Sequence, residues 1–139
     1  MIKVLLDTNV LLDIVLQREP HYKYSSKLII EIDGNSIKGF ITATTITDIY
    51  YLIRKSKGRD IALTFIENLI SFIDVIAVDK AIIFNAIESE ILDFEDAVQI
   101  FASISSSIDY IITRNTNDFT KSEIPAYSPK EFLESYSLF

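Results

Sequence analysis

Short apolar runs alternate along the chain with segments in which apolar residues recur every three or four positions. The first run, residues 2–6, is apolar except for Lys3, as expected for a strand of a parallel sheet that is covered on both faces. Further strands are predicted at residues 37–41, 75–78, 109–113 and 125–127. Strands that alternate with helices indicate an α/β fold in which helices cover both faces of a mostly parallel sheet of about five strands.

Helical segments are predicted between these strands. The spacing of apolar residues places them after residue 9, over about 24–33, 46–57, 62–73, 79–91 and 93–104, and from residue 129. The first two are expected to form a helical hairpin, and Gly58 is expected to end the third helix. Residues 42–45 are expected to form a polar turn between the second strand and that helix.

The composition fits one domain, residues 1–139, with a substantial core, because 49% of the 139 residues are hydrophobic. The absence of cysteine excludes disulfides and thiolate zinc sites. The N-terminus lacks the layout of a signal peptide, and acids interrupt every long apolar run before it reaches membrane-spanning length. A soluble cytoplasmic protein with no membrane partner is therefore expected.

The net charge of −7 argues against a surface that coats nucleic acid, since such binding depends on Lys and Arg. Any contact with nucleic acid must be local or assisted by metal ions. The densest basic group, residues 54–59, suits a solvated helix end better than a binding site.

Four aspartates follow or begin elements that this arrangement brings to one edge of the sheet. Asp7 and Asp118 follow strands, whereas Asp48 and Asp96 lie in early turns of helices. Each has a structural explanation as a cap or turn residue. Convergence is costly, however, because two carboxylates about 4 Å apart repel by roughly 4 kcal/mol at an effective dielectric near 20. A set of oxygen ligands favours a hard ion, Mg²⁺ or Mn²⁺, and hence phosphodiester hydrolysis.

Four motifs in order resemble those of PIN domains, over essentially the whole chain. They are KVLLDTNVLLD at residues 3–13, TITDIYYL at 45–52, DFEDA at 93–97 and ITRNTNDF at 112–119. The resemblance implies a three-layer α/β/α sandwich, acidic residues that bind Mg²⁺ or Mn²⁺, and endoribonuclease activity. Many small members are VapC-type toxins of toxin–antitoxin pairs, commonly dimers held by a cognate antitoxin.

Residue by residue, Asp7 matches the first acid of the family, Asp96 the third, and Thr113 the threonine of the last motif. Two positions depart from the common pattern. Asp48 stands where the family usually has glutamate, and Asn115 replaces an acid, which leaves Asp118 as the nearest ionised candidate.

The expected function is a metal-dependent endoribonuclease, with RNA as substrate, a cognate antitoxin as partner and a homodimer as the assembly. The expected catalytic residues and metal ligands are Asp7, Asp48, Asp96 and Asp118. Orienting roles are expected for Thr8, Asn9, Thr113 and Asn115, and a contact with substrate phosphate for Arg114.

Two alternatives remain open from the sequence. A degenerate PIN domain would bind protein or RNA without cutting it, which Asp48 and Asn115 favour. A phosphatase of the haloacid-dehalogenase type also begins with a strand ending in aspartate, but that family has a second aspartate where this chain has Asn9.

Overall fold

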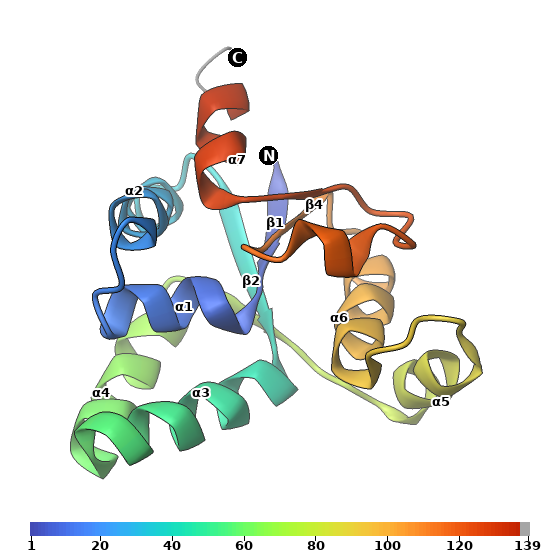
Figure 1. Cartoon of the computed structure of the whole chain (residues 1–139), viewed down its shortest axis with the longest axis horizontal. Helices are drawn as coiled ribbons and strands as arrows, with labels where there is room; N and C mark the ends of the chain where they lie inside the picture. Colours follow the sequence, from blue (N-terminus) through green and yellow to red (C-terminus); the bar gives the residue numbers. More distant parts are fainter. Residues whose placement is uncertain (137–139) are drawn as a thin grey trace.

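The computed structural model describes residues 1–136 and contains a five-stranded sheet between two layers of helices (Figure 1). The strands are β1 (Lys3–Leu6), β2 (Lys38–Thr42), β3 (Asp74–Ile76), β4 (Tyr110–Ile112) and β5 (Ala126–Tyr127). All neighbouring pairs are parallel, in the order β3-β2-β1-β4-β5. The predicted α/β/α sandwich is confirmed, and residues 137–139 of the predicted domain lie outside the described residues.

The helices divide between the two faces of the sheet. They are α1 (Thr8–Val15), α2 (His21–Asp33), α3 (Ala43–Lys57), α4 (Arg59–Ile70), α5 (Lys80–Glu88), α6 (Phe94–Ser105), the 3-10 turn η1 (Thr116–Phe119) and α7 (Pro129–Tyr136). Figure 1 shows α1–α4 on one side of the sheet and α5 and α6 on the other. No helix among residues 1–136 is long and apolar enough to cross a membrane.

The central strand is buried on both faces from Val4 to Leu6, as its apolar sequence predicts. Val4 and Leu6 pack in the core formed with α1–α4 and α7, whereas Leu5 packs in the core formed with α5 and α6. All three side chains have no exposed surface. Alternate side chains of β1 therefore hold both helical layers to the sheet.

The turn predicted at residues 42–45 is wrong, because α3 begins directly after β2. Thr42 is the N-cap of this helix, and its Oγ1 accepts a hydrogen bond from the backbone N–H of Thr45 at 3.2 Å. Threonine favours this position because its side chain satisfies one of the free N–H groups in the first turn. The predicted end of α3 is confirmed at Gly58, whose φ of 92° is readily adopted by glycine.

The strand order changes direction at β1. The chain runs from β1 outward through β2 to β3, then returns to place β4 on the other side of β1. In parallel sheets, ligands bind beyond the carboxyl ends of strands at such a point. Here that position lies between Asp7, which follows β1, and Thr113, which follows β4.

Candidate active site

The Asp7 carboxylate is held by four hydrogen-bond donors. Oδ1 accepts from the backbone N–H of Thr8 at 2.7 Å and from Nε2 of Gln99 at 3.0 Å. Oδ2 accepts from Oγ1 of Thr113 at 2.7 Å and from Nδ2 of Asn9 at 3.3 Å. These donors come from α1, α6 and the segment after β4, so Asp7 links both helical layers at the end of the central strand.

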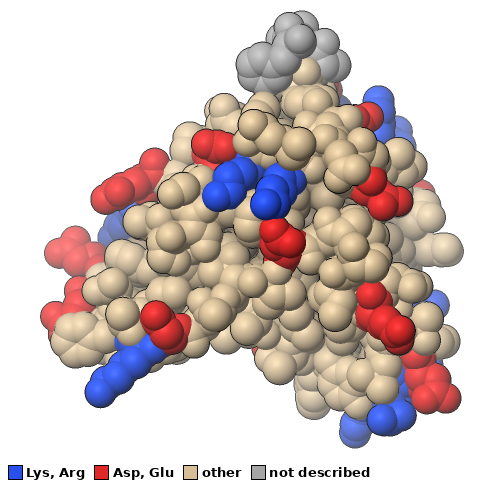
Figure 2. Space-filling view, turned by 180° about the vertical axis from the view of Figure 1, so that it is seen from behind, with Lys and Arg blue, Asp and Glu red and all other residues tan. Residues whose placement is uncertain are grey.

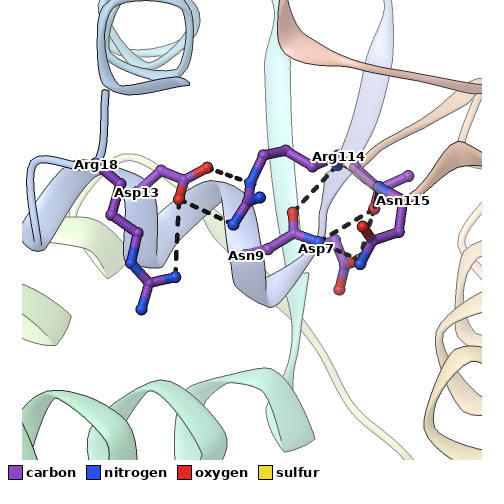
Figure 3. Close-up of polar contacts among 7 residues, drawn as sticks. Asp7, Asn9, Asp13, Arg18, Arg114 and Asn115 are labelled. Atoms are coloured by element: carbon purple, nitrogen blue, oxygen red, sulfur yellow. Dashed lines mark hydrogen bonds and ion pairs between the residues drawn. The ribbon is translucent and has the colours of Figure 1, made fainter. Parts of the chain in front are cut away.

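The loop after β4 is tied to α1 by a second set of contacts, drawn in Figure 3. Oδ1 of Asn9 accepts from the backbone N–H of Arg114 at 3.2 Å, and Oγ1 of Thr113 accepts from that of Asn115 at 3.0 Å. The predicted orienting residues Asn9, Thr113 and Asn115 therefore lie beside Asp7, although Asn115 takes part through its backbone.

Asp48 and Glu95 meet across the site from α3 and α6. The pKa of Glu95 is raised from 4.5 to about 8, first by a hydrogen bond with the Asp48 carboxyl group and then by burial. The negative charges of Asp48, Asp7 and Asp93 add to this shift. Glu95 therefore keeps a proton near neutral pH, and this proton joins the two carboxyl groups.

Asp96 lies in the first turn of α6, and its pKa is raised from 3.8 to about 7. Burial is the largest cause, followed by the charges of Asp93, Asp7 and Asp118. The four predicted acids thus interact electrostatically in two groups. In the first, the charges of Asp7 and Asp118 act on Asp96. In the second, Asp48 is hydrogen-bonded to Glu95, on which the charge of Asp7 also acts.

The donor chemistry of this site fits a hard divalent cation. The acids Asp7, Asp48, Glu95, Asp96 and Asp118 offer carboxylate oxygens, which Mg²⁺ and Mn²⁺ prefer. Repulsion between their charges adds to the effects of hydrogen bonding and burial that raise the pKa values of Glu95 and Asp96. Within residues 1–136, however, no three acidic or histidine side chains converge closely enough to form a ready-made metal site. A bound cation would therefore have to draw the acids together.

Sequence reasoning missed Glu95 and Gln99. Glu95 lies next to Asp96 in the same motif, and its contact with Asp48 depends on how α3 and α6 pack. Gln99 follows Asp96 by three residues and so lies near it on the helix surface. Its amide contact with Asp7 depends on how α6 packs against β1, which the sequence pattern does not define.

Arg114, predicted to contact substrate phosphate, lies against Asp13 of α1. Its Nε is 2.6 Å from Oδ2 of Asp13, and its Nη2 donates to Oδ1 at 3.2 Å. The Asp13 side chain has no exposed surface, and Arg18 approaches it at 3.9 Å (Figure 3). Arg114 thus anchors the loop beside Asp7, and its contact with phosphate stays a prediction.

The raised carboxyl pKa values predict that the fold loses stability as pH rises. Between pH 4.5 and about 8, an unfolded glutamate has lost the proton that Glu95 retains when folded. Unfolding then releases a proton, so the free energy of unfolding falls with increasing pH. Asp96 acts in the same direction between 3.8 and about 7. We expect the Tm in metal-free buffer to fall across this range.

The matched variant for this measurement is Glu95→Gln, which cannot ionise. Its Tm is expected to fall less steeply than that of the parent protein over the same pH range, because only the contribution of Asp96 and other groups remains. Equal slopes for the two proteins would show that Glu95 carries no raised pKa.

Comparisons with known proteins agree with this fold and these motifs. A family model described as "PIN domain" matches residues 3–117. The chain is 27% identical over 140 residues to Ribonuclease VapC1 of Aquifex aeolicus (strain VF5), covering 97% of this chain and 96% of that protein.

Solved structures with a similar fold include a DNA-bound VapBC of Salmonella typhimurium, with a TM-score of 0.70 and 20% identity. That match covers 93% of this chain and 99% of the other. A second is VapC20 of Mycobacterium tuberculosis, described as a Sarcin-Ricin loop cleaving toxin. Its TM-score is 0.64 at 11% identity, over 78% of this chain and 86% of the other.

Proposed function

This chain belongs to the PIN-domain family, and we propose that it is a metal-dependent endoribonuclease that acts as the toxin of a type II toxin–antitoxin pair. The observation that carries the proposal is the group of acids that interact with one another around Asp7, at the carboxyl end of the central strand. The similarity to Ribonuclease VapC1 along nearly the full length of both proteins supports the reaction class.

The proposed metal ligands are Asp7, Asp48, Glu95, Asp96 and Asp118. A bound Mg²⁺ or Mn²⁺ would supply an activated water and neutralise charge on the phosphate. In the overall reaction, the water oxygen bonds to phosphorus, the P–O3′ bond breaks, and O3′ takes a proton. The products are a 3′-hydroxyl and a 5′-phosphate.

The other residues of the site fix the direction of the Asp7 carboxylate. Thr113 and Gln99 donate to different oxygens of Asp7 at 2.7 and 3.0 Å, so the group cannot rotate without losing a hydrogen bond. Asn9 joins Asp7 to the loop that carries Asp118. These hydrogen bonds orient the Asp7 carboxylate before a cation arrives, so its orientation does not have to be fixed during binding.

A cognate antitoxin is the proposed protein partner. Solved complexes of VapBC proteins share the fold of this chain. The outer surfaces of α3 and α4 expose large apolar side chains, namely Tyr51, Leu52, Ile61 and Leu63. Such a surface suits an amphipathic helix of an antitoxin or a second copy of the chain in the predicted homodimer.

A noncatalytic binding module is the second candidate. It is favoured by Asn115, which stands in place of an acid, and by the absence of a ready-made metal site within residues 1–136. Under this alternative the protein would bind RNA or a partner but would not hydrolyse RNA.

Metal removal distinguishes the two candidates. We expect purified protein, freed of any bound partner, to cut a mixed RNA pool with Mn²⁺ or Mg²⁺, to stop in EDTA, and to recover when the metal is restored. Cleavage that continues in EDTA would point to a contaminating nuclease. A folded protein that cuts nothing with either metal would be assigned to the noncatalytic class.

A further inference from the structure

A cavity of about 350 Å³ opens between the start of α2 and the start of α7. We call it the α2–α7 pocket. Its walls include Pro20, His21, Tyr24, Arg114 and Lys130. The volume falls within the range of small-molecule sites. In the sequence, Arg114 directly follows Thr113, whose hydroxyl donates a hydrogen bond to Asp7. One wall residue of the pocket is therefore next to a residue of the candidate active site in the chain.

Cationic side chains gather around one aromatic ring at this pocket. Lys23 Nζ lies 4.9 Å from the centroid of the Tyr24 ring, and Lys130 Nζ lies 5.7 Å from it. Both lysines are exposed, and Arg114 forms part of the pocket wall. This concentration is notable in a protein with a net charge of −7.

One face of the molecule carries its charges differently. On the face shown in Figure 2, the described Lys and Arg side chains lie singly or in small groups beside Asp and Glu, separated by broad uncharged areas. Of the acids near the α2–α7 pocket, two have internal partners, whereas Glu19, which directly precedes Pro20, is exposed. Asp13 is buried against Arg114, and Glu131 accepts a hydrogen bond from the backbone N–H of Ser128 at 3.1 Å.

We propose that the α2–α7 pocket binds one nucleotide of a single-stranded segment of the RNA substrate. Lys130 and Arg114 contact its phosphate, and the Tyr24 ring stacks with its base. The inference rests on the proposed ribonuclease function. Asp13 engages Nε and Nη2 of Arg114, so the guanidinium is fixed while its remaining N–H groups are available to an anion.

The ring favours a nucleotide over an acidic peptide. A peptide carboxylate would use the cations alone, whereas a nucleotide uses both the cations and an aromatic face, the combination typical of single-strand recognition. The lysine heads are on flexible, exposed side chains and can move from the ring to the phosphate when a base arrives.

The test is binding of a fluorescein-labelled single-stranded RNA of about ten nucleotides, measured by anisotropy in EDTA so that cleavage is blocked. Tyr24→Leu is expected to weaken binding about tenfold, through the loss of stacking. Lys130→Ala is expected to weaken it by a few-fold and to reduce the slope of log affinity against log salt by about 0.7. Lys80→Ala, on α5 away from the pocket, is the matched control and should bind like the parent protein.

The outcomes separate this inference from the proposed function. Unchanged RNA binding by folded Tyr24→Leu and Lys130→Ala overturns the pocket assignment, even if the protein cuts RNA with Mn²⁺. Sensitivity to Lys130→Ala alone also overturns it, since that pattern fits any anion, including an acidic peptide. Binding that depends on both residues supports the pocket, whether or not the separate Mn²⁺ assay detects cleavage.

Discussion

Asp96→Asn is expected to reduce metal-dependent RNA cleavage by about 100-fold or more while leaving the protein folded. Removal of a group that merely orients a metal ligand typically costs 10- to 100-fold, so loss of a proposed ligand should cost at least as much. Stability should not fall, because the pKa of Asp96 is raised to about 7 by burial and by neighbouring acids. A neutral amide of the same shape removes that repulsion.

Asp93→Asn is the matched control for this prediction. Asp93 caps α6 by accepting the backbone N–H of Asp96 at 2.9 Å, and asparagine caps helices equally well. The control also removes one negative charge near the site, but not a proposed ligand, so cleavage should stay within a few-fold of the parent rate. Full activity in Asp96→Asn, or equal losses in both variants, would contradict the assignment of Asp96.

Asp96 is a cleaner test than Asp7 because their structural roles differ. Asp7 accepts four hydrogen bonds and starts α1, so Asp7→Asn would place an amide donor against donors that now face a carboxylate. A loss of activity there would combine chemistry with local disorder. Asp7 therefore helps to hold the fold together, whereas ionised Asp96 lowers the stability of the fold.

The fold was predictable where it depends on local pattern. The apolar residues 4–6 of β1 are covered on both faces because each of these side chains meets a helical layer. Gly58 ends α3 because its positive φ suits glycine. The turn predicted at residues 42–45 failed because threonines are common both in turns and at N-caps. Only the hydrogen bond from Thr45 to Thr42 distinguishes the two.

The sequence indicated which acids lie at the candidate site, but not which residues they contact. Asp7, Asp96 and Asp118 follow from their places after strands and at a helix start, and they do interact. The Asp48–Glu95 contact instead depends on how far α3 lies from α6, and no pattern within either helix encodes that distance. The ion pair between Arg114 and Asp13 was not predictable either, because Asp13 lies 101 residues earlier in the chain.

Arg114→Ala is expected to lower the free energy of unfolding by about 3 kcal/mol, the lower end of the range for a buried ion pair that loses one partner. Asp13 has no exposed side-chain surface, so it cannot exchange Arg114 for water. The expected loss of unfolding free energy lies at the lower end of that range because Arg18, 3.9 Å from Asp13, still partly balances its charge. Because a domain of this kind has a total stability of about 5–15 kcal/mol, the loss is readily measured by urea unfolding.

Two further variants identify the buried charge as the cause. Arg18→Ala should cost no more than about 1 kcal/mol, because that side chain is 44% exposed and its ion pair is long. Adding Asp13→Asn to Arg114→Ala should restore part of the lost stability, because the double variant no longer buries an unpaired carboxylate. If the double variant is less stable than Arg114→Ala by the full cost of Asp13→Asn alone, the two residues act independently. The loop beside Asp7 would then be held by the contact between Asn9 and the Arg114 backbone rather than by this ion pair.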